Sequence, residues 1–439
     1  MSTVLWQPSA ARIADANMTA FGHYVQARFG LQLPDYAALH AFSIEQRERF
    51  WTSLWDFAQI VARDKGEQVL VDGDRMPGAH WFPQARLNFA ENLLAGRQRV
   101  WGERGNLDPE RPVILFQGED KVRTELSFRQ LHEQVSVLAQ AMRAAGLRPG
   151  DRVAAYLPNM PETIIGMLAA TSLGAIWSSC SPDFGARGVL DRFGQIEPRL
   201  LLCVDGYYYA GKTHDTLDKT REIIAALPSV EQVVLVPYVD PQAVEQNARA
   251  LSDKAVSLAA FVADYAPRDI EFEQLPFEHP LYILYSSGTT GVPKCIVHGA
   301  GGTLLQHMKE HLLHTDIKPG DRLFYFTTTG WMMWNWLVSG LASGATLVLF
   351  DGSPFHPDAS VLFDLADRVG IDVFGTSAKY IDAVKKSGLV PRESNRLDEL
   401  RAILSTGSPL VPESFDFVYD SIKTDVCLSS VSGGTDIVS

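Results

Sequence analysis

One turn occurs twice in this 439-residue chain with the same surroundings each time. Leu147-Arg-Pro-Gly-Asp-Arg152 is matched by Ile317-Lys-Pro-Gly-Asp-Arg322, and Leu173-Gly-Ala-Ile-Trp177 is matched by Ser343-Gly-Ala-Thr-Leu347. In each pair the second copy lies 170 residues after the first. Turns of this kind also arise independently between helices and strands, but the shared spacing favours an internal duplication of one α/β unit.

The first α/β unit contains sequence signals for the starts of its helices. Ser127 and Gln130 have the spacing of a capping box, and apolar residues then recur at helical spacing. A strand at 153–157, a helix opened by Pro161 and a strand at 175–178 follow. This alternation predicts two related α/β layers with largely parallel sheets.

A loop rich in glycine and hydroxyl groups, Tyr285-Ser-Ser-Gly-Thr-Thr-Gly-Val-Pro-Lys294, follows the apolar run 281–284 and precedes a predicted strand at 295–298. Glycine lets the main chain approach a ligand closely, while hydroxyl groups and a lysine can bind phosphate oxygens. The alternative is a solvated surface turn. The candidate phosphate-binding residues are Ser286, Ser287, Gly288, Thr289, Thr290, Gly291 and Lys294.

The loop differs from a Walker A loop. Pro293 stands where glycine is needed, and Cys295 stands where Ser or Thr would hold magnesium. The difference excludes a kinase or GTPase of the P-loop type.

Composition excludes several other classes. The net charge of -13 argues against a nucleic-acid partner. The charge-free runs 163–182 and 323–350 are interrupted by polar residues and glycine, so neither predicts a membrane span. The N-terminal residues lack the pattern of a signal peptide. Four cysteines without metal-like spacing predict buried, reduced thiols and a cytoplasmic protein.

Several motifs carry a family resemblance. The string SSGTTGVPKCIVH resembles the phosphate loop of the adenylate-forming superfamily, and the stretch 81–94 (WFPQARLNFAENLL) resembles the N-terminal extension of its acetyl-CoA and acetoacetyl-CoA synthetase branch. The resemblance implies the α/β fold of the large N-terminal domain of these enzymes. We expect a helical extension at 1–95, one α/β subdomain at 96–275 and a second at 276–439.

Three later motifs extend this resemblance. Gly330-Trp-Met-Met-Trp-Asn335 resembles one wall of the carboxylate pocket, and Thr406-Gly-Ser-Pro-Leu410 resembles the turn that faces adenine. Ser432-Gly-Gly-Thr-Asp436 stands where the family has a threonine that meets the α-phosphate and an acidic residue that holds magnesium. Aspartate here replaces the usual glutamate.

The resemblance assigns a role to each of these residues. Lys294, Thr435 and Asp436 are expected to take part in catalysis, with Asp436 as the Mg²⁺ ligand. The expected nucleotide contacts beyond the phosphate loop are Gly407, Ser408, Pro409, Gly434 and Thr435, and the expected acyl-pocket residues are Trp331, Met332, Met333, Gly407 and Gly433. Arg187 and Arg192 are expected on one short helix, facing coenzyme A or solvent.

The implied activity is ATP-dependent ligation of a small carboxylic acid to coenzyme A, with acetoacetate:CoA ligases as the nearest resemblance. No acidic residue lies between Asp321 and Asp351 to pair with an ammonium group, which argues against an amino acid substrate. The alternatives are an acetyl- or propionyl-type synthetase and a non-catalytic adenylate-binding module. The chain is expected to stop before the mobile C-terminal domain, and the sequence does not indicate an oligomeric state.

Three histidines, His307, His311 and His314, lie at helical spacing after the phosphate loop. They lack the HExxH signature of a zinc site. We expect them on an exposed helix face rather than around a metal.

Overall fold

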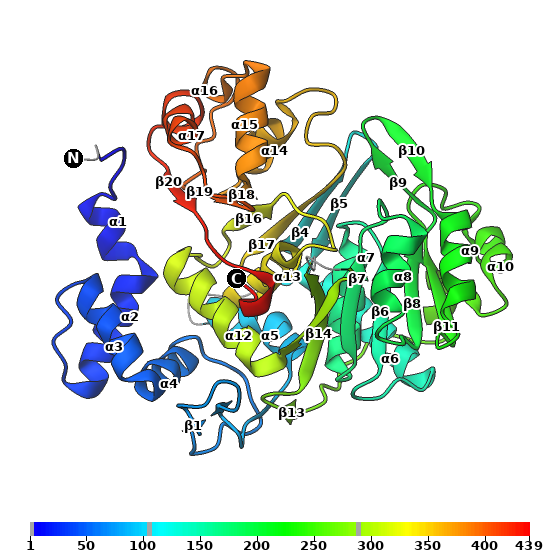
Figure 1. The fold of residues 1–439 in the computed structure, drawn as a ribbon, viewed down its shortest axis with the longest axis horizontal. Coiled ribbons are helices and arrows are strands. Elements are labelled where there is room, and N and C mark those ends of the chain that lie inside the picture. The colour runs from blue at the N-terminus through cyan, green and yellow to red at the C-terminus, as the bar shows by residue number, and fades with distance from the viewer. Residues whose placement is uncertain (1–3, 103–107, 287–290) are drawn as a thin grey trace.

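The computed structural model describes residues 4–102, 108–286 and 291–439, and it contains two seven-stranded sheets (Figure 1). Within these ranges, none of the helices has the length and apolar character needed to cross a membrane.

The first sheet has the strand order β12-β11-β8-β6-β7-β14-β15. Neighbouring strands are parallel except β14 and β15, which are antiparallel. Its strands are β6 (Arg152–Tyr156), β7 (Ile176–Cys180), β8 (Leu200–Val204), β11 (Gln232–Val236), β12 (Ala255–Ser257), β14 (Pro280–Ser286) and β15 (Lys294–Gly299).

The second sheet repeats this arrangement with the order β20-β19-β18-β16-β17-β4-β5. It is again parallel apart from one antiparallel pair at the end, β4 and β5. Its strands are β4 (Pro112–Gly118), β5 (Val122–Ser127), β16 (Arg322–Tyr325), β17 (Thr346–Asp351), β18 (Val373–Ser377), β19 (Ala402–Thr406) and β20 (Cys427–Ser430).

The duplicated turns have the same geometry in both sheets. Gly150 donates its backbone N–H to Gly174 O at 2.9 Å, and Gly320 donates to Gly344 O at 2.9 Å. The φ angles of Gly150 and Gly320 are 88° and 90°, which only glycine adopts readily. The predicted pair of related, largely parallel α/β layers is confirmed.

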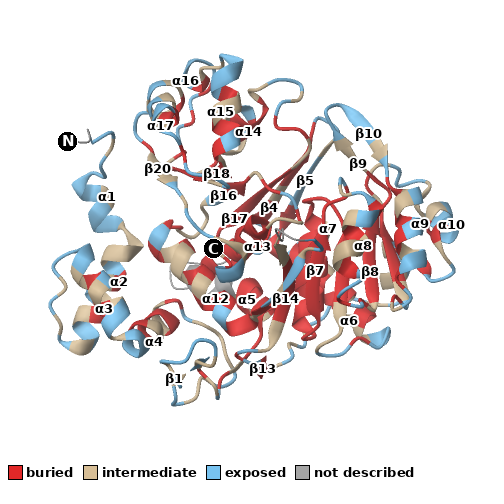
Figure 2. Cartoon of the chain, in the orientation of Figure 1, coloured by how far each residue is buried: buried red, intermediate tan, exposed pale blue. Residues whose placement is uncertain are grey.

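Helices divide the molecule into layers. One large core between the sheets joins them to α5 (Phe89–Gly102), α6 (Phe128–Ala144), α7 (Pro161–Ser172), α12 (Ala300–Met308), α13 (Met332–Ser339) and the 3-10 turn η2 (Gly340–Ser343). The outer face of the first sheet packs against α8 (Ala186–Phe193), α9 (Leu217–Ala226) and α10 (Val244–Leu251). The outer face of the second packs against α14 (Val361–Val369), α15 (Ala378–Ser387) and the π-helical segment η3 (Val418–Ile422). Figure 2 shows the strands of both sheets largely buried.

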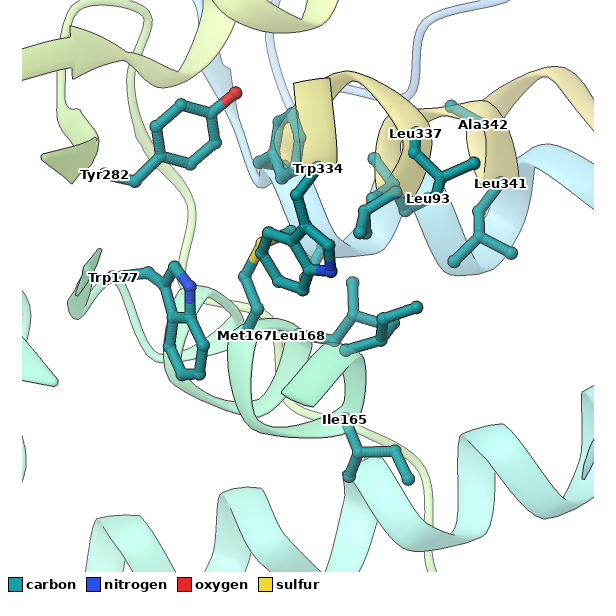
Figure 3. Close-up of a cluster of buried hydrophobic side chains, with 14 of the residues drawn as sticks. Leu93, Ile165, Met167, Leu168, Trp177, Tyr282, Trp334, Leu337, Leu341 and Ala342 are labelled. Atoms are coloured by element: carbon teal, nitrogen blue, oxygen red, sulfur yellow. The ribbon is translucent and has the colours of Figure 1, made fainter. Parts of the chain in front are cut away.

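Two tryptophans mark the centre of the large core (Figure 3). Trp177 of β7 and Trp334 of α13 are both fully buried, with ring centroids 6.4 Å apart. Trp334 Nε1 donates to Asn159 Oδ1 at 3.1 Å, so its polar atom is satisfied. The wall motif that contains Trp334 is therefore anchored to the first sheet.

The N-terminal residues form the predicted helical extension. Its helices α1 (Ala10–Asp15), α2 (Asn17–Phe29), α3 (Tyr36–Glu45) and α4 (Arg47–Phe57) share a small aromatic core with the π-helical segment η1 (Lys309–His314). Phe21 lies 5.7 Å from Phe50 and 5.3 Å from Phe57, both edge to face. Asn88 then ties the extension to the first unit through bonds to Thr171 O and Ser172 O.

Short elements complete the fold. They are β1 (Leu70–Val71), β2 (His80–Trp81), β3 (Arg86–Leu87), β9 (Gly206–Tyr209), β10 (Lys212–Asp215), β13 (Leu275–Pro276), α11 (Leu258–Val262), α16 (Pro391–Ser394), α17 (Pro412–Phe417) and the 3-10 turn η4 (Thr435–Ile437). The division at 275/276 stays a prediction. The sheets do not follow this boundary. Strands β14 and β15 lie after it in the sequence but join the first sheet, and β4 and β5 lie before it but join the second.

Two expectations about side chains were wrong. His307 and His311 are fully buried rather than exposed, and only His314 of the three lies at the surface. Cys295 is exposed and Cys427 is partly buried, because both lie on outermost strands of the sheets, whereas Cys180 and Cys203 are buried as expected.

Candidate functional site

The predicted phosphate loop joins β14 to β15 as a hairpin. Ser286 and Lys294 pair across its base, and Gly291 has φ 138°, a conformation that favours glycine. Four of the predicted residues, Ser287, Gly288, Thr289 and Thr290, lie outside the described residues. The described part of the loop places Lys294, which is exposed, at the first position of β15.

Side chains alternate between the two faces of β15. Lys294, Ile296 and His298 therefore share one face, and Cys295 and Val297 share the other. His298 is buried at 8% exposure and lines a cleft of about 520 Å³ together with Asp436. The alternation places the Lys294 ammonium on the side of the sheet where Asp436 lies.

Helix α8 packs against the loop. Gln195 Nε2 donates to Pro293 O at 2.9 Å. The Arg192 guanidinium lies 4.7 Å from the Phe184 ring centroid and 5.7 Å from that of Tyr285, the residue that opens the loop motif. Arg187 is exposed on the same helix. The structure thus places Arg192 beside the phosphate loop and leaves Arg187 facing solvent.

All five predicted acyl-pocket residues line one pocket of about 350 Å³. Trp331, Met332 and Met333 come from the start of α13, Gly407 from the turn after β19, and Gly433 from the segment after β20. The predicted nucleotide contacts Ser408, Pro409, Gly434 and Thr435 line it too. The pocket thus joins residues that are about 100 positions apart in the sequence.

The turn after β19 depends on Gly407, whose φ of 86° strains any other residue. Thr406 Oγ1 donates to Val431 O at 3.2 Å, and Val431 N donates to Ser405 O at 2.7 Å. These bonds hold the turn beside the segment that follows β20, so the two sides of the pocket are fixed to each other.

Gly433 is constrained by space rather than by its φ angle. Its φ lies outside the left-handed region, but an added Cβ would lie 2.0 Å from the backbone oxygen of Ser439. A larger residue here therefore requires a shift of the main chain.

Thr435 and Asp436 begin η4, and they border different hollows. Thr435 lines the 350 Å³ pocket with Met332, while Asp436 lines the 520 Å³ cleft with His298. Burial lowers the pKa of His298, although a bond to the backbone of Thr435 and the charge of Asp436 oppose this. The threonine–aspartate pair thus forms the partition between the pocket and the cleft.

The family comparison accounts for this combination of elements. The profile of AMP-binding enzymes matches residues 102–431, and that of the acetyl-coenzyme A synthetase N-terminus matches residues 36–93. The chain belongs to the AMP-binding enzyme family. The two profiles together cover the extension from α3 onward, both sheets and most of the pocket.

Similar proteins carry related names. An acetoacetyl-coenzyme A synthetase of Rhizobium meliloti is 54% identical over 99% of this chain and 64% of its own length, and an acetoacetyl-CoA synthetase of Mus musculus is 45% identical with the same coverage. A malonamoyl-CoA synthetase of Penicillium aethiopicum is 43% identical over 99% of the chain and 62% of its own length.

Among solved structures, the acetoacetyl-CoA synthetase from Streptomyces lividans matches with a TM-score of 0.91 and 42% identity over 100% of this chain and 66% of that one. The chain therefore spans less than two thirds of the length of these relatives.

The residues of this AMP-binding enzyme fit a magnesium ion at Asp436. Its carboxylate is exposed, and in the part of the chain that the structure describes no basic side chain lies within 4.0 Å of it. Mg²⁺ prefers one or two carboxylates combined with phosphate oxygens and water. The free carboxylate of Asp436 is available for that role.

We expect Asp436→Asn to raise the magnesium concentration needed for half-maximal ATP–pyrophosphate exchange by about 10-fold, because a neutral amide oxygen replaces an anionic ligand. The measurement is a magnesium titration at fixed ATP. An unchanged requirement would show that Asp436 only shapes the turn.

A second group of potentially metal-ligating side chains, Glu119, Asp120 and His356, lines neither the pocket nor the cleft. Glu119 accepts backbone N–H groups from Ala210, Gly211 and Ser353 at 2.7–2.9 Å. Its carboxylate therefore connects three loops and serves a structural purpose.

Sequence reasoning missed two residues at the site. Gln195, in the turn that follows α8, contacts the phosphate loop, and nothing in its local sequence signals this. His298 could have been found, because strand alternation places it on the same face as Lys294.

Proposed function

We propose that this chain is the ATP- and acid-binding part of an acid–thiol ligase that converts acetoacetate to acetoacetyl-CoA. The observation that carries the proposal is the pocket in which the Trp331–Met333 wall, the Gly407 turn and Thr435 meet, together with the packing of η4, which begins at Thr435, against β14 of the phosphate-loop hairpin. The names of the similar proteins support the choice of acid.

In the first step a carboxylate oxygen of the acid attacks the α-phosphorus of ATP, and pyrophosphate leaves. Lys294 and the loop hydroxyl groups stabilise the charge on the phosphoryl oxygens, and Thr435 donates to the α-phosphate. Asp436 would hold Mg²⁺, which neutralises phosphate charge when it is bound. In the second step the thiolate of coenzyme A attacks the acyl carbon, and AMP leaves.

The pocket wall favours a small acid with an uncharged acyl group. Met332 and Met333 are buried at 6% and 4% exposure, and no acidic residue lies between Asp321 and Asp351 in the sequence. An ammonium group would therefore lack a counter-charge on this wall. Acetoacetate and malonamate, the acids implied by the relatives' names, both have a carbonyl group at their third carbon. We therefore propose short 3-oxo acids as the substrate class, with acetate and propionate as the alternative.

Coenzyme A is expected to approach along α8. Arg187 is exposed and can bind a phosphate group, whereas Arg192 already lies over two aromatic rings and orients the loop.

The free cysteines support a cytoplasmic location.

Thioester formation by the full-length protein tests the proposal, with acetoacetate, acetate, propionate and 3-hydroxybutyrate as separate substrates. We expect the highest kcat/KM with acetoacetate. A higher value with acetate or propionate would support the alternative acid class, and nucleotide binding without thioester formation would indicate a binding module.

A further inference from the structure

Three elements of the site meet at His307. This residue lies near the end of α12, the helix that follows the phosphate-loop hairpin. Its Nδ1 lies 2.7 Å from the hydroxyl oxygen of Ser339 in α13, and its Nε2 lies 2.7 Å from the backbone oxygen of Val438. The side chain is fully buried. One imidazole therefore joins the phosphate-loop helix, the helix of the acyl wall and the segment after η4.

The bonding partners define the tautomer of His307. A backbone carbonyl can only accept, so Nε2 carries the proton and donates it to Val438. Nδ1 then accepts the single hydroxyl proton of Ser339, which is directed to the imidazole at 2.7 Å rather than to the backbone oxygen of Asn335 at 3.0 Å. Burial lowers the pKa of His307 to about 4, which keeps the ring neutral near pH 7.

The segment that His307 holds is strained. Val438 has φ 54°, a left-handed conformation that is rare for a β-branched residue. Such a conformation is unfavourable and persists only where its surroundings hold it. Val438 is buried at 4% exposure, and the next residue, Ser439, donates its hydroxyl to Glu310 Oε1 at 2.5 Å. Contacts with α12 and η1 thus hold Val438 in its left-handed conformation, and Val438 lies two residues after Asp436.

We infer that His307 is a positioning residue, which holds Asp436 and Thr435 at the partition between the pocket and the cleft through its bond to Val438. The inference rests on the proposed role of Asp436 as a magnesium ligand. His307 touches neither nucleotide nor acid in this account, so its loss should change the geometry of metal binding rather than remove a ligand.

The neighbouring His311 provides a matched control. It is equally buried, and its Nε2 lies 2.9 Å from the backbone oxygen of Trp336, which is not part of the segment after β20. We expect His307→Leu to raise the magnesium concentration for half-maximal ATP–pyrophosphate exchange in the full-length protein by about 10-fold, and to weaken the binding of Mg²⁺ to the protein–ATP complex, measured by calorimetry, by a similar factor. His311→Leu should lower the melting temperature without changing the magnesium requirement. Equal magnesium requirements in the two variants would overturn the inference.

Two smaller changes test the same bond in case the leucine variant does not fold. The amide nitrogen of His307→Gln can occupy the place of Nε2 and donate to Val438, whereas that of His307→Asn falls at the place of Nδ1. We expect glutamine to keep the magnesium requirement within about 2-fold of the original and asparagine to raise it by about 10-fold. The reverse order, or no difference between them, would contradict the inference.

Asp436→Asn in the same titration separates the inference from the proposed function. If Asp436→Asn leaves the magnesium requirement unchanged, the proposed metal site is wrong and the inference falls with it. If Asp436→Asn raises the requirement and His307→Leu does not, only the positioning role is wrong.

Discussion

Replacing Lys294 with alanine is expected to reduce ATP–pyrophosphate exchange by about 100-fold or more, because a fixed positive charge beside the reacting triphosphate is lost. Lys294 is exposed at the start of β15, so its removal leaves no cavity in the core. The melting temperature should therefore stay within about 2 °C of the original value. Initial exchange rates at saturating acid measure the effect.

Cys295→Ser is the control for this variant. Cys295 is the next residue on the same strand, is exposed and faces away from Lys294. We expect its exchange rate to stay within about 2-fold of the original. Similar losses in both variants would mean that the strand, rather than the lysine charge, had been disturbed.

Trp334→Ala is expected to lower the free energy of unfolding by about 3–5 kcal/mol. Trp334 is fully buried between the two sheets, where its ring stacks on Trp177 at an interplanar angle of 22° (Figure 3). The change leaves a cavity and removes the hydrogen bond that Asn159 accepts. Chemical denaturation measures the loss.

Tyr36→Ala provides the comparison for the tryptophan, because the aromatic ring of Tyr36 is 60% exposed. We expect a change below about 0.5 kcal/mol there. A loss of less than about 1 kcal/mol for Trp334→Ala would contradict the packing described for the core between the sheets.

The duplicated fold was predictable because its turn chemistry is local. Gly150 and Gly320 need positive φ angles, and the motif around them specifies that conformation in both copies. Two hairpins each join the sheet of the other unit: β4–β5 joins the second sheet, and β14–β15 joins the first. This was not predictable, because the sequences of these strands do not specify which sheet edge they join.

Burial of the histidines was missed for a similar reason. Helical spacing indicated a polar face on His307 and His311, but both rings bond to backbone oxygens of residues distant in the sequence, Val438 and Trp336. A buried polar side chain is tolerated when such a partner satisfies it, and the local pattern does not show the partner.

The members of the candidate site were predictable from their motifs, but the arrangement of Thr435 and Asp436 was not. The motif suggested one shared site for the pair, whereas in the structure Thr435 borders the pocket and Asp436 borders the cleft, so that the pair separates the two hollows. The bond that we infer to hold this arrangement, from His307 to Val438, joins residues 131 positions apart and forms only in the folded chain.

Acid-dependent ATP–pyrophosphate exchange in the full-length protein tests the central claim most directly, because it requires the phosphate loop, the acyl pocket and Asp436 together. We expect exchange that depends on added acid and magnesium and is fastest with acetoacetate. Binding of ATP without exchange in the presence of acetoacetate, acetate or propionate would contradict it.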